Sequence, residues 1–149
     1  MTPYALGAVH AERMAAIHAA SFPKPWDALE MSRHTARDLC LGAGEPLASF
    51  AVLRTSDVDA EVLTVATDPA RRGCGLAGDV LDAAHAACRA RGLRDVFLEV
   101  AEDNAPARAL YERLAYRPIG RRPGYYARPG GRMAAITYAL SLDGPGAGG

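Results

Sequence analysis

Residues 63–77 read LTVATDPARRGCGLA, and this stretch decides the fold of the chain. Its first residues are apolar and often β-branched, as in a buried strand, and the Asp-Pro pair that follows makes a turn. A basic loop with Gly73 and Gly75 then leads into a segment rich in Ala and Leu. The order strand, glycine loop and helix predicts an anion site, because Arg72 and the backbone N–H groups that open a helix both attract a phosphate.

The glycine loop does not fit the two most familiar nucleotide motifs. A dinucleotide fingerprint needs a third glycine, and a P-loop needs Gly-Lys-Ser/Thr, whereas the single lysine of this chain is Lys24. The spacing Arg72-x-x-Gly75-x-Ala77 instead resembles the pyrophosphate loop of the GNAT superfamily of N-acetyltransferases, whose pattern is Gln/Arg-x-x-Gly-x-Gly/Ala. In that family the loop holds the pyrophosphate of acetyl-coenzyme A.

A second stretch extends the resemblance. From Asn104 the chain reads N-x-x-A-x-x-L-Y-x-x-x-A-Y, which is similar to the family pattern N-x-x-A-x-x-L-Y-x-x-x-G-F. Ala115 replaces the glycine expected just after the helix, at a cost of about 1 kcal/mol if the backbone there is left-handed. The resemblance implies an acetyl-coenzyme A-dependent N-acetyltransferase with one GNAT-type α+β domain, in which helices flank a mixed, mostly antiparallel sheet.

Composition agrees with a single domain. Half of the 149 residues are hydrophobic, 23% are charged and the formal net charge is zero, so we expect a globular domain over residues 1–142 and a disordered glycine-rich tail over 143–149. No apolar run nears the ~20 residues that span a bilayer, and the N-terminus lacks a signal-peptide pattern. The three cysteines have no paired or metal-binding spacing. We therefore expect a cytoplasmic monomer or weak dimer with no bound metal, membrane or nucleic acid.

Charge is distributed unevenly along the chain. Acidic residues outnumber basic ones before residue 71, and arginines outnumber acidic residues after it. This asymmetry suits a domain that holds an anionic cofactor with one part and a cationic substrate with another, although scattered solvated charge explains it equally well.

Periodicity and turn residues predict ten regular elements. Helices are expected at 8–20, 28–35, 76–90 and 104–114. Strands are expected at 39–41, 47–54, 60–67, 96–100, 117–121 and 133–140. The stretch rich in Arg, Gly, Pro and Tyr between the last two strands is expected to be a loop.

The resemblance also implies a set of cofactor-binding residues. In the family, the strand before the glycine loop separates from its neighbour, and its backbone contacts the pantetheine arm and the acetyl carbonyl. Asn104 is expected to cap a helix and to touch the cofactor. The set comprises Val65, Ala66, Thr67, Arg72, Gly73, Cys74, Gly75, Leu76, Ala77 and Asn104.

Glu99 is the candidate general base for removing a proton from the attacking amine, directly or through water. It lies inside an apolar strand, where a carboxylate is costly to bury without a partner. Spacing alone favours the alternative, a solvated side chain on the polar face of that strand. The resemblance of the segment LEV at 98–100 to ribosomal-protein alanine N-acetyltransferases favours the base.

Tyr111 is the candidate general acid for the departing coenzyme A thiolate, since a phenol can donate a proton to a thiolate of comparable basicity. The alternative is a helix tyrosine that packs beside Leu110 and Leu114. The match to the second family pattern favours the acid.

Three segments resemble the ribosomal-protein alanine N-acetyltransferases: SFPKPW at 21–26, LEV at 98–100 and RRPGYY at 121–126. In that family such loops line a slot for a protein N-terminus, which implies that Trp26, Tyr125 and Tyr126 bind the acceptor. The two tyrosines could equally be core residues of the last hairpin.

The implied acceptor is the N-terminal α-amine of a protein, the alanine of a small-subunit ribosomal protein. Two alternatives stay open: acetylation of a small amine or a lysine side chain, and a coenzyme A-binding sensor without turnover.

Overall fold

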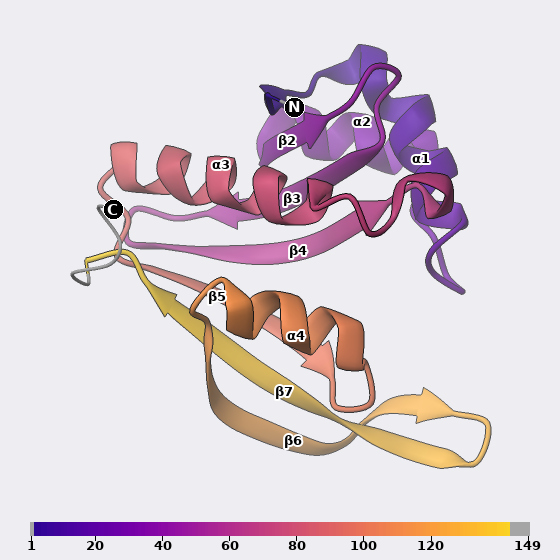
Figure 1. Cartoon of the computed structure of the whole chain (residues 1–149), viewed down its shortest axis with the longest axis vertical. Helices are drawn as coiled ribbons and strands as arrows, with labels where there is room; N and C mark the ends of the chain where they lie inside the picture. Colours follow the sequence, from indigo (N-terminus) through magenta and orange to yellow (C-terminus); the bar gives the residue numbers. More distant parts are fainter. Residues whose placement is uncertain (1, 144–149) are drawn as a thin grey trace.

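The computed structural model describes residues 2–143, in which seven strands form one sheet of order β1-β2-β3-β4-β5-β7-β6 (Figure 1). The strands are β1 (Tyr4–Ala5), β2 (Leu39–Ala43), β3 (Ser49–Thr55), β4 (Asp59–Thr67), β5 (Asp95–Ala101), β6 (Arg117–Arg128) and β7 (Gly131–Ser141). The α-helices are α1 (Ala11–Ala19), α2 (Ala28–Arg37), α3 (Leu76–Ala90) and α4 (Ala105–Arg113), and short 3-10 turns are η1 (Ala8–His10) and η2 (Pro69–Arg71). Among the strands of the described residues, only β4 and β5 pair in parallel. The predicted α+β class with a mixed, mostly antiparallel sheet is confirmed.

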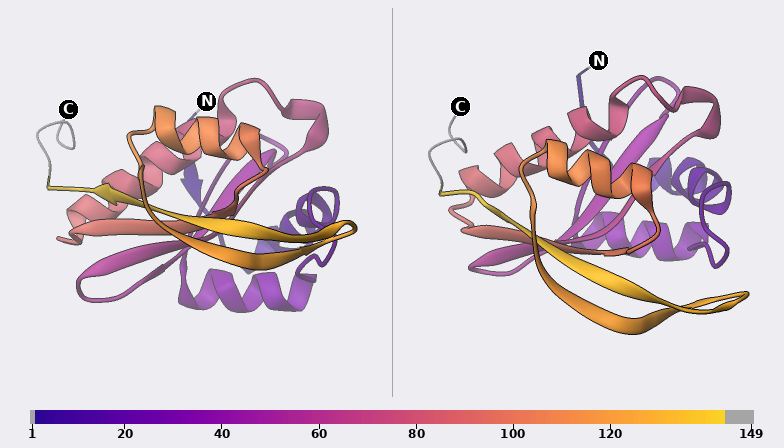
Figure 2. Two further views of the ribbon diagram at one scale, coloured as in Figure 1. Left: turned by 90° about the horizontal axis from the view of Figure 1, so that it is seen from below. Right: turned by 60° about the horizontal axis from the view of Figure 1, so that its bottom comes forward.

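Helices cover both faces of the sheet (Figure 2). On one face, α3 and α4 bury a core with β5, to which Val80, Leu81 and Leu98 contribute. On the other face, α1 and α2 pack on β3 through residues such as Met14 and Phe50. The two cores explain why the sheet strands are apolar on alternate residues or throughout.

Local sequence signals set several helix ends. Asp27 and Glu30 form a reciprocal capping box at the start of α2, with Asp27 Oδ1 accepting from the Glu30 backbone N–H at 2.9 Å. Gly92, with a φ of +76°, follows the end of α3. The helices expected at 28–35 and 76–90 are therefore confirmed, the first with two more residues. Strand β1 was missed because two residues give no periodic signal.

The loop expected between 121 and 133 is wrong, because β6 and β7 continue as one long hairpin to Arg128 and Gly131. Four steps of β6, from Arg122 to Tyr126, lie opposite two steps of β7, so the extra residues bulge out of the ladder. Proline and glycine within this bulge resemble a loop in the sequence, which explains the error.

The parallel pair β4–β5 is short. The two strands pair only from Asp59 opposite Asp95 to Glu61 opposite Phe97. Beyond these positions β4 stays paired with β3 up to Thr67, and β5 stays paired with β7 up to Ala101. The strands thus diverge, and from residue 62 onward the backbone groups of β4 that face β5 have no strand partner. We call this feature the β4–β5 divergence.

None of the helices in residues 2–143 is long and apolar enough to cross a membrane. The tail expected to be disordered lies, apart from Asp143, outside the described residues.

The chain leaves α4 through a Schellman motif. The Tyr116 N–H donates to the Tyr111 carbonyl at 3.0 Å, and the Ala115 N–H donates to the Glu112 carbonyl at 3.1 Å. Ala115 has a φ of +74°, the one positive value at a non-glycine residue in the described chain. The left-handed position expected from the sequence is therefore confirmed, and a β-carbon occupies it.

Replacing Ala115 with Gly should stabilise the protein by about 1 kcal/mol, because glycine adopts a positive φ without steric cost. Ala109→Gly is the matched control: the same exchange at an exposed position inside α4 should destabilise by about 1 kcal/mol. Urea unfolding measures both changes. Destabilisation by both variants would contradict the account of this helix end.

Candidate active site

The glycine loop joins η2 to α3 and exposes its backbone. Gly73 and Gly75 have φ values of +81° and +78°, and Gly75 is the N-cap of α3. No side chain caps the helix start, so its first N–H groups stay available to an anion. Within residues 2–143, only a glycine's own atoms and its two chain neighbours come within 4 Å of where a β-carbon would stand on Gly73 or Gly75. The predicted order of strand, loop and helix is confirmed here.

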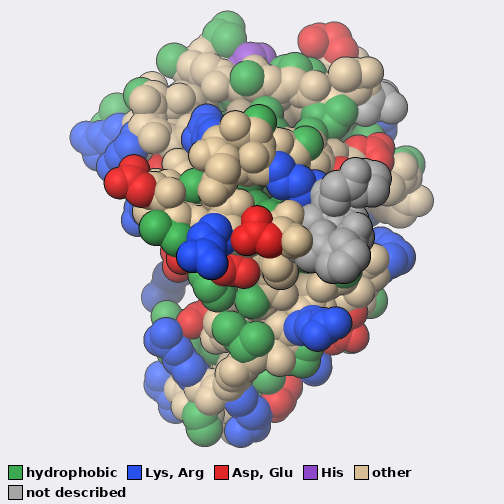
Figure 3. All heavy atoms as spheres, turned by 90° about the vertical axis from the view of Figure 1, so that its left-hand side faces the viewer, with side chains coloured by type: hydrophobic (Ala, Val, Ile, Leu, Met, Phe, Trp, Pro, Cys, Tyr) green, Lys and Arg blue, Asp and Glu red, His purple; other side chains and the backbone are tan. Residues whose placement is uncertain are grey.

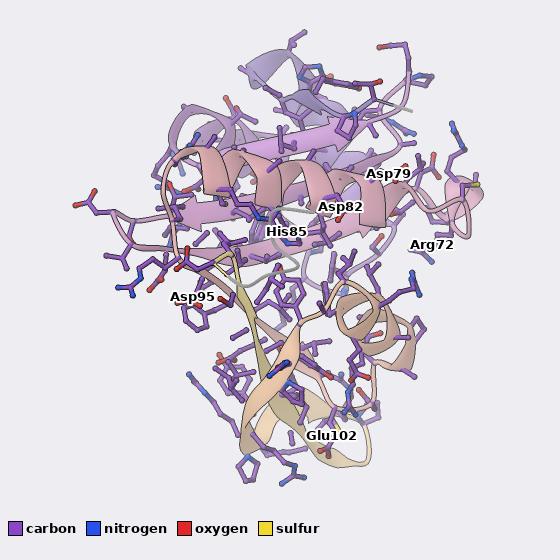
Figure 4. All side chains as sticks on the ribbon, turned by 60° about the vertical axis from the view of Figure 1, so that its left-hand side comes forward. Arg72, Asp79, Asp82, His85, Asp95 and Glu102 are labelled. Carbon is purple, nitrogen blue, oxygen red and sulfur yellow. The ribbon has the colours of Figure 1, made fainter. Side chains whose placement is uncertain are left out.

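Arg72 and Cys74 are exposed on this loop, whereas Leu76 and Ala77 form the first turn of α3. Figure 4 shows Arg72 beyond the N-terminal end of α3, the end at which Asp79 lies. The Arg72 guanidinium donates to Ser21 Oγ at 3.1 Å, so it links the loop to the segment after α1.

Val65, Ala66 and Thr67 lie on β4 within the β4–β5 divergence. Ser49 supports the end of this strand from β3: its hydroxyl lies 2.9 Å from Thr67 Oγ1 and donates to the Ala66 carbonyl at 3.2 Å. This end of β4 is therefore fixed to β3, while its backbone groups on the side of β5 remain free for a ligand.

Tyr111 reaches the site from α4, on the face that also carries α3. Asn104 caps this helix by accepting from the Ala107 N–H at 3.3 Å, as expected from the sequence. The Tyr111 ring is buried and meets the Tyr116 ring edge-on at 5.7 Å. Tyr116 is anchored in turn by a 2.7 Å hydrogen bond with the buried His85 of α3.

Burial raises the pKa of Tyr111 to about 12, and the hydroxyl of Tyr126 adds to the effect. The phenol therefore keeps its proton at neutral pH. No hydrogen bond involves its hydroxyl in the part of the chain that the structure describes, so this O–H group is free to donate a hydrogen bond.

Glu99 lies on β5 beyond the last position that pairs with β4. Its neighbours Leu98 and Val100 belong to the core under α3 and α4, so strand alternation puts Glu99 on the opposite face. Its side chain is 25% exposed, and Oε1 lies 3.0 Å from a guanidinium nitrogen of Arg122. The carboxylate is therefore partly buried and paired, so it is neither fully solvated nor buried without a partner.

Tyr126 connects the two candidate catalytic groups. Burial, and after it the charge of Glu99, raises the pKa of Tyr126, which in turn affects Tyr111. The three residues come from three different elements: Glu99 from β5, Tyr126 from β6 and Tyr111 from α4.

Tyr125 is 48% exposed and meets the Tyr126 ring edge-on at 5.0 Å. It is therefore not a core residue of the hairpin. Figure 3 shows that basic side chains gather at the end of the molecule that this hairpin forms.

Trp26 lies in a stack of rings. Its indole packs between His18, at 4.9 Å, and His34, at 4.4 Å. The backbone N–H of Trp26 donates to His18 Nδ1, so the opposite ring nitrogen carries the proton that His18 donates to Thr64 Oγ1 at 3.1 Å. Trp26 is thereby fixed to β4 through His18, and no contact in the described chain joins it to Glu99 or Tyr111.

Arg122 is the site residue that the sequence analysis missed. The paired arginines at 121 and 122 were quoted only as part of a resemblance, and nothing in the sequence separates the one that contacts Glu99 from its neighbour.

Within residues 2–143, no group of three or more His, Cys, Asp or Glu side chains is arranged to hold a metal ion.

A short parallel strand pair that diverges in front of a glycine loop is the arrangement implied for the acetyltransferase class. Residues 11–116 match the model of the Acetyltransferase (GNAT) family. The chain belongs to this family.

Sequence relatives include two enzymes named [ribosomal protein bS18]-alanine N-acetyltransferase. The one from Haemophilus ducreyi is 35% identical over 95 residues, which cover 63% of this chain and 66% of the relative. The one from Haemophilus influenzae is 33% identical over 94 residues, 62% of this chain and 64% of the relative. The match thus spans just under two thirds of these relatives. A mycothiol acetyltransferase of Clavibacter michiganensis is 45% identical over 71 residues, 48% of this chain and 23% of the relative.

Solved structures agree over nearly the whole chain. The ribosomal-protein-S18-alanine N-acetyltransferase from Escherichia coli superposes with a TM-score of 0.85 at 28% identity, covering 95% of this chain and 93% of that one. Arabidopsis thaliana NAA60, in complex with a bisubstrate analogue, superposes with a TM-score of 0.82 at 18% identity over 93% and 96% of the two chains, which shows the shared fold.

Gly75→Ala should weaken coenzyme A binding at least tenfold, about 1.4 kcal/mol, because the β-carbon strains a positive φ and intrudes on the exposed helix start. Gly92→Ala is the control: Gly92 has a similar φ of +76° and equally open surroundings, but it lies at the far end of α3. The affinity of Gly92→Ala for coenzyme A should be unchanged. Titration calorimetry measures both, and equal affinities for the two variants would exclude the loop as the binding site.

Proposed function

We propose that this protein transfers the acetyl group of acetyl-coenzyme A to the N-terminal α-amine of a protein, and that the acceptor is the N-terminal alanine of a small-subunit ribosomal protein. One observation carries the proposal: Glu99 lies on β5 past the end of the β4–β5 pairing, Tyr111 packs with Leu98 and Val100 on the opposite face of that strand, and a glycine loop leaves the start of α3 without a side-chain cap. The names of the relatives support the acceptor. A ribosomal acceptor implies a reaction in the cytoplasm.

In this proposal the cofactor lies along the exposed helix start and the free edge of β4. Gly73 to Ala77 and Arg72 hold the pyrophosphate through backbone N–H groups and charge. Backbone groups of Val65, Ala66 and Thr67 hold the pantetheine arm and polarise the acetyl carbonyl. Asn104, at the start of α4, borders the same region.

Transfer is direct. The amine nitrogen attacks the acetyl carbon, a C–N bond forms, the C–S bond breaks, and the proton leaving the nitrogen goes to Glu99. The two buried cysteines are poor acyl carriers, because burial raises the pKa of Cys88 and raises that of Cys40 to about 12. No covalent enzyme intermediate is needed.

Tyr111 supports the leaving group. With a pKa of about 12 its phenol is a weaker acid than a thiol, whose ordinary pKa is about 8.5. Complete proton transfer to the thiolate would be unfavourable. Tyr111 therefore acts by donating a hydrogen bond to the sulfur as negative charge develops on it.

The acceptor enters from the face that carries Glu99, where Tyr125 and Tyr126 offer aromatic surface for a peptide. Trp26 forms a more distant wall that the histidine stack keeps in place. A small-molecule amine is the second candidate acceptor, and the similarity to the mycothiol acetyltransferase favours it.

The test is a coenzyme A-release assay with peptides that begin Ala-Arg, the same peptides with a blocked N-terminus, lysine-only peptides and polyamines. Turnover should be confined to free α-amines. Glu99→Gln should lower kcat by about 100-fold to 10,000-fold, since it removes a general base, with the affinity for coenzyme A unchanged. Glu102→Gln, which changes a carboxylate just beyond the end of β5, should keep most of the activity.

Preferred turnover of lysine or polyamine acceptors would contradict the proposed substrate. Tight coenzyme A binding with no turnover on any acceptor would favour a sensor instead.

A further inference from the structure

Arg122 faces the candidate base from the neighbouring hairpin. Its guanidinium lies 3.0 Å from Glu99 Oε1, and 60% of its side chain is exposed compared with 25% for Glu99. The guanidinium carbon also lies 5.3 Å from the centre of the Tyr125 ring, at a distance typical of a cation–π contact. Arg122 thus joins the base to the exposed aromatic surface.

The β6 bulge aims this side chain. Arg122 is the last residue of β6 in regular register with β7 before the bulge, opposite Ala135, and pairing resumes at Tyr126 opposite Met133. Gly124 within the bulge has a φ of +64°, and Arg132 of β7 donates hydrogen bonds to the carbonyls of Gly124 and Tyr125. These hydrogen bonds hold the bulge in one conformation, and the bulge changes the direction of the side chains at its two ends.

The other ion pairs of β6 involve carboxylates outside the β4–β5 divergence. Arg121 makes a two-pronged pair with Glu102, at 2.8 and 3.0 Å, and Arg128 makes one with Asp103, at 3.2 and 3.1 Å. Both carboxylates follow the end of β5. Among the described arginines of β6, only Arg122 pairs with a carboxylate inside the β4–β5 divergence.

We propose that Arg122 is a positioning residue for acetyl transfer: it holds the Glu99 carboxylate in the orientation that accepts the amine proton. A glutamate side chain has three rotatable bonds, and a half-buried carboxylate without a partner would turn toward water. The guanidinium removes that freedom before the acceptor arrives, which is the usual way in which a second residue increases the efficiency of a base. This inference rests on the proposed role of Glu99.

The test compares Arg122→Ala with Arg121→Ala in the peptide acetylation assay. Arg122→Ala should lower kcat about tenfold to a hundredfold, with the KM for acetyl-coenzyme A unchanged. Free guanidine at non-denaturing concentration should restore part of the lost kcat, because it can occupy the vacated place beside Glu99. Arg121→Ala should lose less activity and gain none from guanidine. Should Arg122→Ala fail to fold, Arg122→Gln is used with the same expectations.

A double variant separates this inference from the proposed function. If Arg122 acts through Glu99, Glu99→Gln combined with Arg122→Ala should be no slower than Glu99→Gln alone. If the kcat losses of the two single variants multiply in the double variant, or if guanidine restores no activity to Arg122→Ala, the positioning role is overturned while the role of Glu99 as the base is left intact. An unaltered enzyme that is inactive on every free α-amine would instead overturn the proposed function, and this inference with it.

Discussion

The arrangement of the site depends on the early end of pairing between β4 and β5. Three paired positions, from Asp59–Asp95 to Glu61–Phe97, fix the two strands in parallel, and each strand then follows its outer neighbour. If β4 and β5 stayed paired to their ends, the backbone groups of residues 62–67 would be hydrogen-bonded to β5 and no gap would be left in the sheet. Because the strands separate, one strand edge stays free for a ligand, and groups from both faces of the sheet can approach it.

Different interactions hold the two candidate catalytic groups. Around Tyr111, apolar packing dominates: the Schellman motif after α4 ties Tyr116 to Tyr111, and His85 anchors Tyr116 to α3. Around Glu99, charge dominates, since Arg122 of β6 pairs with its carboxylate, and Arg121 and Arg128 pair with Glu102 and Asp103 just beyond the end of β5. Packing gives Tyr111 a dry environment that keeps its proton in place, whereas the ion pair with Arg122 holds the Glu99 side chain at a partly exposed position.

Sequence reasoning succeeded where local chemistry determines structure. Residues 63–77 predict a strand, a loop and a helix because β-branched residues favour a strand, Asp-Pro favours a turn and the glycines permit a positive φ. The left-handed conformation of Ala115 was expected from its place just after a helix. It failed over residues 122–128, where proline and glycine serve a bulge inside a strand and not a loop. The pairing of Arg122 with Glu99 was also out of reach, because it depends on strand register between segments that are far apart in sequence. Resemblance to a family, rather than spacing, selected Glu99 and Tyr111.

A crystal structure with coenzyme A joined through its sulfur and an acetyl bridge to the α-nitrogen of an Ala-Arg peptide tests the central claim most directly. The account predicts that the pyrophosphate contacts the backbone of residues 73–77 and that the bridge crosses the β4–β5 divergence. The sulfur should lie beside Tyr111 and the α-nitrogen beside Glu99, directly or through one water. A bridge bound outside the divergence, or a peptide that leaves on the face of α3 and α4, would contradict it.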